Sequence, residues 1–295
     1  MIWCVTLNPA LDVTYRLPGE LSRDAVNLAD AMDARLGGKG NNVARVVKTL
    51  GAPVTAVEIL GGSVGEALAH HGRAQGIDIL SESVREDSRI CLTLIGPQGS
   101  VTELRPPGPQ VEEGTAERLL EALAGRVGAR DWVTISGSLP RGLAADTYGR
   151  WVRALKPQVA GVIVDASGAA LLGAVVEGPA AIVPNRSEYE AVAAALAPGV
   201  TEVIVTDGDK GVEWHRALGG VRRWRAPRVK ALNPVGAGDT FLGALVVQLQ
   251  AGQSWPEAIP AAMACASASV ETLGVASFEP GRAHELFGQI EEETR

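Results

Sequence analysis

The stretch from Asn233 to Thr240 (Asn-Pro-Val-Gly-Ala-Gly-Asp-Thr) combines a small-residue loop with a carboxylate at the predicted start of an apolar helix. Gly236, Ala237 and Gly238 leave backbone N–H groups open to a ligand, and the positive end of the helix dipole favours negative charge there. Asp239 could take a proton from a hydroxyl that attacks a phosphorus atom held by those groups. A helix-capping Asp is the ordinary alternative, but it does not explain the small residues. The stretch predicts an anion hole beside a general base.

A second cluster, Gly37-Gly38-Lys39-Gly40-Asn41-Asn42, comes directly before a predicted helix that runs to Leu50. The glycines let a ligand approach the backbone, Lys39 supplies a point charge, and the amides of Asn41 and Asn42 can bond to hydroxyls. Because Gly40 follows Lys39 where a Walker A loop has Ser or Thr, the cluster is not of that kind. A plain helix-capping turn would not need two asparagines. We therefore expect this cluster to bind a polyol that carries an anion.

Three further positions gain interest only from their place beside these clusters. Asp12 follows the first predicted strand, where a parallel sheet presents ligand-binding groups, although a turn Asp fixed by Pro9 explains that segment equally well. Arg89 begins a predicted irregular strand, and Arg141 lies in the polar turn from Ser136 to Gly142. Arginine holds phosphate at a fixed angle through two N–H donors, but most arginines are solvated surface residues.

Two more polar turns follow predicted strands. Asn185 and Glu188 would share one side of a helix, where an amide and a carboxylate can order hydrated Mg2+, although the pair also resembles a helix cap. The turn from Thr206 to Gly211 has the glycines against which a nucleotide can lie, and its alternative is a simple hairpin turn into 212–215.

The composition limits the possible partners and locations. A chain of 295 residues with 46% hydrophobic residues can bury a large core. Its net charge of −7 argues against a general nucleic-acid surface. Three widely spaced cysteines fit neither a disulfide framework nor a zinc site, and no apolar run reaches the roughly 18 residues of a membrane span. We expect a cytoplasmic protein without a membrane or nucleic-acid partner.

Short β-like runs alternate with helical patterns along most of the chain, which predicts a doubly wound α/β fold with a mostly parallel sheet and helices on both faces. The predicted strands are 2–7, 54–59, 132–136, 161–164, 181–184 and 202–206. The predicted helices are 41–50, 65–75, 115–123, 145–155, 187–196, 239–250 and 256–273. We assign residues 1–295 to one domain of this kind.

Two regions depart from the alternation and predict a small β lid, near residues 12–35 and 88–105. In the first, a strand at 12–17 pairs with one at 27–35. In the second, a strand at 89–95 pairs with one at 101–104 through the turn Pro97-Gln98-Gly99.

Taken together, these motifs resemble those of the ribokinase-like (PfkB) carbohydrate kinases over nearly the whole chain. The segments 37–44 (GGKGNNVA) and 233–246 (NPVGAGDTFLGALV) resemble the two family signatures, residues 185–188 resemble the Asn-x-x-Glu motif, and 206–211 resemble the adenosine-binding turn. The sequences LNPALD at 7–12 and SGSLP at 136–140, with Arg89, are similar to the branch that phosphorylates sugar phosphates. Within that branch the chain is most like the 1-phosphofructokinases.

The resemblance implies ATP and Mg2+ as cofactors and transfer of the ATP γ-phosphoryl group to a primary hydroxyl of fructose 1-phosphate. Tagatose-6-phosphate kinase and 6-phosphofructokinase stay open as alternatives, and so, more distantly, does a non-catalytic nucleotide-binding regulator. A homodimer formed through the lid is implied as well.

The implied roles cover most of the residues introduced above. Asp239 is the base, with Gly236, Ala237 and Gly238 as the anion hole; Asp12, Gly38, Lys39, Asn42 and Ser138 bind the sugar, and Arg89 binds its phosphate; Asn185, Thr206, Gly208 and Gly211 bind the nucleotide, and Glu188 binds the metal. The roles of Arg141, a possible phosphate contact, and of Arg105 stay open.

Overall fold

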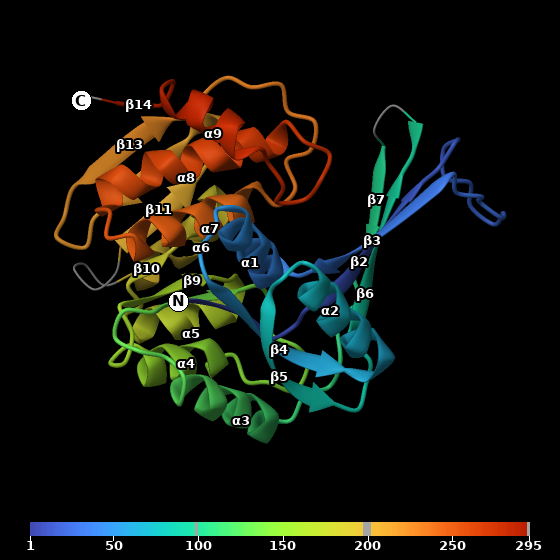
Figure 1. Ribbon diagram of the computed structural model, residues 1–295, viewed down its shortest axis with the longest axis horizontal. Coiled ribbons are helices and arrows are strands. Elements are labelled where there is room, and N and C mark those ends of the chain that lie inside the picture. Colours follow the sequence, from blue (N-terminus) through green and yellow to red (C-terminus); the bar gives the residue numbers. More distant parts are fainter. Residues whose placement is uncertain (98–99, 197–201, 294–295) are drawn as a thin grey trace.

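The structure is a computed structural model that describes residues 1–97, 100–196 and 202–293. A central ten-stranded sheet has the order β14-β13-β12-β11-β10-β9-β8-β1-β4-β5 (Figure 1). Its parallel part comprises β1 (Ile2–Thr6), β4 (Val54–Gly61), β5 (Asp78–Val84), β8 (Trp132–Ser136), β9 (Gly161–Asp165), β10 (Ala181–Ile182) and β11 (Glu202–Thr206). The antiparallel edge comprises β12 (Val212–His215), β13 (Val221–Arg225) and β14 (Glu291–Glu292).

Helices cover both faces of this sheet (Figure 1). One face carries α1 (Lys39–Thr49), α7 (Ala237–Gln250), α8 (Trp255–Val270) and α9 (Pro280–Phe287), with α2 (Gly62–Ala74) beside them on β4 and β5. The other face carries α3 (Glu113–Ala124), α4 (Thr147–Leu155), α5 (Gly168–Val176) and α6 (Arg186–Val192). Each face of the sheet has its own hydrophobic core, and successive residues of the buried strand β1 point into different cores. Cys4 packs under the helices of the first face, and Val5 packs under those of the second.

The strand order reverses beside β1. From β1 the chain moves to β4 and β5 on one side, and then returns to build β8, β9, β10 and β11 on the other side. A crevice outside the carboxyl ends of the strands is the usual ligand site of such a sheet. The fold therefore directs attention to the residues that follow β1, β9, β10 and β11.

A second sheet, which we call the lid sheet, has the order β3-β2-β6-β7 and projects from the body of the molecule (Figure 1). It consists of β2 (Ala10–Arg16), β3 (Ala31–Gly37), β6 (Arg89–Ile95) and β7 (Val101–Leu104). The pairs β2–β3 and β6–β7 are antiparallel, as predicted, and β2 runs parallel to β6. The predicted turn at 97–99 falls on residues 98 and 99, which lie outside the described residues.

Several predicted boundaries were wrong, for local reasons. The strand predicted from residue 27 begins at Ala31, because the Asn27 side chain closes a loop by bonding to the backbone of Ser22. The strand predicted over 181–184 ends at Ile182, since Pro184 has no N–H to donate. The helix predicted over 187–196 ends at Val192 and continues only as a short 3-10 turn. Strands β5, β13 and β14 and the helices α5 and α9 were not predicted.

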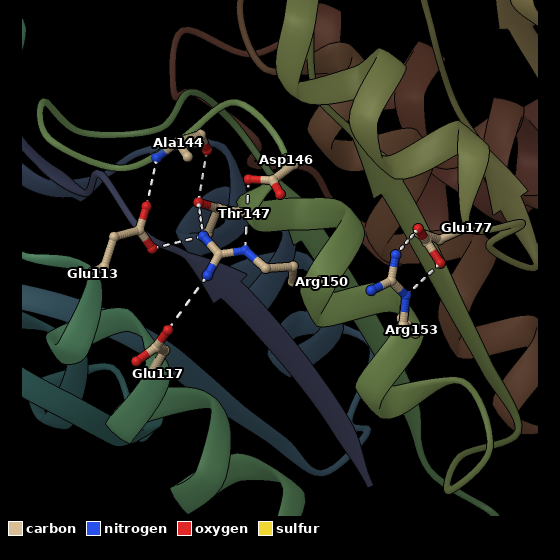
Figure 2. Close-up of polar contacts among 8 residues, drawn as sticks. All are labelled: Glu113, Glu117, Ala144, Asp146, Thr147, Arg150, Arg153 and Glu177. Carbon is tan, nitrogen blue, oxygen red and sulfur yellow. Dashed lines mark hydrogen bonds and ion pairs between the residues drawn. The ribbon is translucent and has the colours of Figure 1, made fainter.

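On the second face, arginines of α4 connect its neighbouring helices (Figure 2). Arg150 bonds to Glu113 of α3 at 2.6 Å and approaches Glu117 at 3.5 Å. Arg153 pairs with Glu177, which directly follows α5. Exposed pairs of this kind contribute about 0 to 1 kcal/mol each, so the buried apolar residues carry the packing.

Within the described residues, the structure has no helix long and apolar enough to cross a membrane.

Candidate active site

A cavity of about 430 Å3 opens where the carboxyl ends of the strands, the lid sheet and the first turns of α1 and α7 meet. Its lining includes most of the predicted site residues: Asp12, Gly38, Lys39, Asn42, Arg89, Asn185, Glu188, Thr206, Gly236, Gly238 and Asp239. These residues are widely separated in sequence, and the fold brings them together. Their assigned roles remain predictions.

Asp239 is buried in the wall of this cavity, with 6% of its surface exposed. Asn42 of α1 donates a hydrogen bond from Nδ2 to Asp239 Oδ2 at 2.7 Å. Burial and the nearby Asp165 carboxylate raise the pKa of Asp239 to about 7, against the hydrogen bond from Asn42 and the charge of Lys39. A carboxyl group with a pKa near neutrality is suited to accept a proton at physiological pH.

The first turn of α7 presents backbone donors beside this carboxylate. The helix begins at Ala237 and not at the predicted Asp239, because Gly236 adopts φ 82° and forms the N-cap. Asp239 is therefore the third residue of the helix, and an N-cap role for it is excluded. The N–H of Ala237 donates a hydrogen bond to Pro234 O at 3.3 Å. The N–H groups of Gly238 and Asp239 belong to the first turn, whose donors have no acceptor within the helix.

Helix α1 reaches the same point, because it packs closely on α7. A Cβ atom on Gly243 of α7 would lie 2.7 Å from Cβ of Val46 in α1, so only glycine permits this approach. At the N-cap of α1, Gly38 has φ 98°, a conformation that favours glycine. The two helices thus direct their positive ends into one cavity.

Lys39 makes an ion pair that the sequence analysis missed. Its Nζ lies 2.9 Å from Oδ1 of Asp165, which is the last residue of β9 and also lines the cavity. Burial opposes the charge of Lys39, but the Asp165 carboxylate outweighs it, and the pKa of Lys39 is raised. Asp165 directly follows the predicted strand 161–164, so the rule that selected Asp12 could have found it.

We expected Asn41 to bind the ligand, but it does not face the cavity. It is completely buried in α1, where its Nδ2 donates to Gly37 O at 2.9 Å and to the carboxyl group of Glu58. Burial raises the pKa of Glu58 to about 7, against the hydrogen bond from Asn41. Only Asn42 of the two asparagines therefore contributes to the cavity.

The lid sheet supplies the opposite wall. The carboxyl group of Asp12 lies over Gly37, where an added Cβ would approach Asp12 Oδ2 to 2.1 Å. Burial raises the pKa of Asp12, and the positive charges of Arg89 and Arg105 oppose this shift. Arg89 Nη2 donates to Asn8 O at 2.9 Å. Arg105, whose role the sequence left open, also lines the cavity.

Two residues of the turn after β8 lie apart from these groups. Ser138 is not among the described residues that line the cavity; its hydroxyl accepts a hydrogen bond from Asn8 Nδ2 at 3.2 Å. Arg141 donates to Gly108 O at 3.0 Å and pairs with Glu86 at 2.8 Å. These contacts give Arg141 a role in holding loops together, and nothing in them favours a phosphate contact.

A smaller cavity of about 130 Å3 adjoins the main one and shares Thr206 and Gly238 with it. Gly208, Gly211 and Ala237 line it. The turn from Thr206 to Gly211 does connect antiparallel strands, β11 and β12, as the hairpin alternative required. A nucleotide role and a hairpin are thus compatible here.

Asn185 and Glu188 form a reciprocal helix cap at the start of α6. Asn185 Oδ1 accepts from the N–H of Glu188 at 2.9 Å, and Glu188 Oε2 accepts from the N–H of Asn185 at 3.0 Å. The described residues contain no group of three or more His, Cys, Asp or Glu side chains arranged for a metal ion. Mg2+ usually takes one or two carboxylates together with phosphate oxygens and water, so Glu188 at the cavity wall fits that donor set.

Comparisons with known proteins identify the family of the chain. The model of the pfkB family of carbohydrate kinases matches residues 6–282. The 1-phosphofructokinase of Escherichia coli (strain K12) is 31% identical over 288 residues, which covers 92% of this chain and 91% of that protein.

Two solved structures show the same fold. Phosphofructokinase-2 from Escherichia coli in complex with potassium has a TM-score of 0.89 at 24% identity and covers 98% of each chain. Ribokinase from Thermotoga maritima has a TM-score of 0.75 at 20% identity and covers 98% of this chain and 99% of that one. The predicted ribokinase-like α/β fold is confirmed, and so is the predicted enzyme class, an ATP-dependent sugar kinase. The chain belongs to the pfkB family of carbohydrate kinases.

Proposed function

We propose that the chain transfers the γ-phosphoryl group of ATP to a ketohexose phosphate, with fructose 1-phosphate as the preferred acceptor and fructose 1,6-bisphosphate as the product. The observation that carries the proposal is the position of Asp239. This buried carboxylate lines the cavity that the lid sheet bounds, and its neighbour Gly238 lines both that cavity and the smaller one beside the turn from Thr206 to Gly211. An acceptor hydroxyl and a phosphoryl donor can meet there in line.

The lid side of the main cavity favours an acceptor that already carries an anion. Arg89 and Arg105 both line it, together with Asp12, and their positive charges act on the Asp12 carboxyl group. In a chain with a net charge of −7, a local pair of guanidinium groups is a specific feature. Arginine binds phosphate esters through paired N–H donors, while a carboxylate such as Asp12 accepts hydrogen bonds from hydroxyls. The similarity to a 1-phosphofructokinase supports the same acceptor class.

In the proposed reaction, Asp239 accepts the proton of the acceptor hydroxyl, and Asn42 keeps the carboxylate oriented towards it. The N–H groups of Gly238 and Asp239 and the ammonium group of Lys39 stabilise charge on the transferred group. Mg2+, for which Glu188 would be a ligand, would neutralise charge on the ATP phosphates when bound.

An initial-rate assay of ADP release tests the proposal against three acceptors: fructose 1-phosphate, fructose 6-phosphate and tagatose 6-phosphate. Free fructose serves as the control without an ester. We expect the highest kcat/KM with fructose 1-phosphate and little turnover of fructose. If the enzyme prefers either 6-phosphate, that sugar replaces fructose 1-phosphate as the proposed acceptor. If it uses free fructose equally well, it is not a phosphosugar kinase.

We also propose a cytoplasmic homodimer that forms through the lid sheet. Met32, Ile90 and Leu104 expose large apolar side chains on one face of this sheet, which supports a covered face. The free thiols of Cys4, Cys91 and Cys265 are consistent with a reducing compartment. Sedimentation equilibrium of the wild-type chain and of Ile90→Glu with Leu104→Glu tests the interface. A wild-type monomer would contradict it.

A further inference from the structure

Arg45 of α1 is outside the main cavity and reaches the catalytic carboxylate only through Asn42. It lies one helical turn beyond Asn42, and a separate surface hollow contains its side chain together with Arg35 and Lys48. Direct contact with the substrates is therefore not its role.

The guanidinium of Arg45 joins four separate segments through neutral acceptors. Nη1 donates to Asn42 Oδ1 at 2.9 Å and to Val275 O at 3.3 Å. Nη2 donates to Leu36 O at the end of β3, and Nε donates to Gln75 Oε1 at 3.3 Å. In the described part of the chain no carboxylate lies within ion-pair distance of this half-buried cation. A half-buried cation whose hydrogen bonds all go to neutral groups needs a reason.

The contact with Asn42 gives that reason. An amide side chain has a donor end and an acceptor end, and Arg45 occupies the acceptor end, Oδ1. The donor end, Nδ2, must then face Asp239, as its 2.7 Å hydrogen bond to Oδ2 shows. A flipped amide would place its oxygen against the carboxylate, which would favour the protonated acid and remove the base.

Through its contact with Val275, Arg45 also supports the loop before α7. Gly236 packs so closely on this residue that an added Cβ would lie 2.7 Å from Val275 Cγ1. Through Leu36 O the guanidinium also holds the end of β3, next to Gly37. One side chain thus joins the loop beside the anion hole, the base and the root of the lid sheet.

We propose that Arg45 is a positioning residue for the catalytic base, fixing the Asn42 amide so that its N–H group faces Asp239. The inference rests on the proposed phosphoryl transfer. It adds that a residue which contacts neither substrate controls the protonation of the Asp239 carboxylate.

The charged groups around Asp239 and around Arg45 define the expected effect of pH on catalysis. Asp239 is faced by Asp165 of β9 and by Lys39 and Arg45 of α1. Burial and the negative charge of Asp165 raise its pKa to about 7, against the hydrogen bond from Asn42 and the two positive charges, which lower it. Arg45 itself is faced by Arg35 and Asp33 of β3, Asp12 of β2 and Asp239 of α7. Loss of the guanidinium removes a positive charge and frees the amide, and both changes raise the pKa of Asp239.

The test is a titration of the Asp239 carboxyl carbon by 13C NMR, assigned through its absence in Asp239→Asn. We expect Arg45→Met to move the midpoint upward by about one pH unit, and to lower kcat/KM at pH 6 about tenfold with recovery by pH 9. Lys48→Met is the matched control, since this cation lies one turn further along α1 in the same hollow and should titrate like wild type. A wild-type midpoint in Arg45→Met, or an equal loss of activity at every pH, overturns the proposal.

Arg45→Lys provides a second variant if Arg45→Met does not fold. It keeps the charge but not the planar fork, so a smaller upward shift is expected, and no shift would contradict the positioning role. The NMR readout is independent of the acceptor. A shifted carboxyl titration in an enzyme that phosphorylates none of the sugars would refute the proposed function and leave the action of Arg45 on Asp239 standing.

Discussion

Asp239 and Asp165 illustrate how neighbouring carboxylates take different roles at the scale of single residues. Asp165 is paired with Lys39 at 2.9 Å, whereas Asp239 faces an amide and remains available to a hydroxyl. Two acids whose environments differ in this way can serve as charge partner and base in one site.

The raised pKa of Asp239 predicts the pH dependence of catalysis. Below its pKa the carboxyl group holds a proton and cannot accept another, so kcat/KM should fall on the acid side with a midpoint of about 7. Initial rates between pH 5 and 9 measure this limb. A profile that stays flat down to pH 5 would contradict the assignment, and Asp239→Asn should abolish the limb.

Arg89 predicts how the ester on the sugar is held. Arg89→Ala should lose about 2 to 3 kcal/mol from charge-assisted hydrogen bonds, which raises KM for the phosphosugar roughly 30- to 160-fold. The KM for ATP should hardly change. Arg141→Ala is the control, because this arginine also bonds to a backbone carbonyl but lies outside the cavity lining. A raised KM for ATP instead would place Arg89 on the nucleotide side.

The sequence predicted these residues unevenly. Asp239 and Lys39 were found because glycine-rich loops identify the helix ends that carry them. Asp165 was missed because no glycine-rich signature contains it, and only the end-of-strand rule that selected Asp12 points to it. Asn41 was misplaced, because only the packing of α1 on β4 shows that it faces Glu58. Motifs report local geometry, while the partner of a buried side chain depends on the tertiary fold.

At the scale of elements, the first turn of α7 would determine the geometry of the proposed anion hole. Gly238 lies there with no atom within 4 Å of an added Cβ, which would point into open space. A side chain at this position would therefore block the approach of a phosphoryl group without disturbing the fold.

Gly238→Val should consequently lower kcat by roughly 10²- to 10³-fold, the usual effect of losing one such donor, while circular dichroism stays unchanged. Gly281→Val is a closely matched control. Gly281 is likewise the second residue of a helix, α9, and an added Cβ there also meets nothing within 4 Å. A folded, fully active Gly238→Val enzyme would rule out the anion hole.

The elements themselves were predictable where the hydrophobic pattern was regular. Except for β5, the strands of the parallel sheet were found, and so were the helices α1, α3, α4 and α7, with ends that differ by a few residues. The start of β3 depends on a loop closed by Asn27, and β5 is a sheet edge with mixed burial, so neither has a clear local pattern.

For the whole molecule, topology places the chemistry. The reversal of strand order beside β1 opens the crevice, the lid sheet closes one side of it, and α1 and α7 converge there because Gly243 lets them pack together. The central claim is that this arrangement holds one buried carboxylate, Asp239, as the base for phosphoryl transfer.

The most direct measurement of that claim is kcat of Asp239→Asn with ATP and fructose 1-phosphate, together with the Kd for ATP from calorimetry. Asp146→Asn, an acid at the start of α4, is the control. We predict that kcat of Asp239→Asn falls by about 10²- to 10⁴-fold while ATP binding is retained and Asp146→Asn stays active. A kcat for Asp239→Asn close to that of the wild-type enzyme would remove Asp239 from the mechanism.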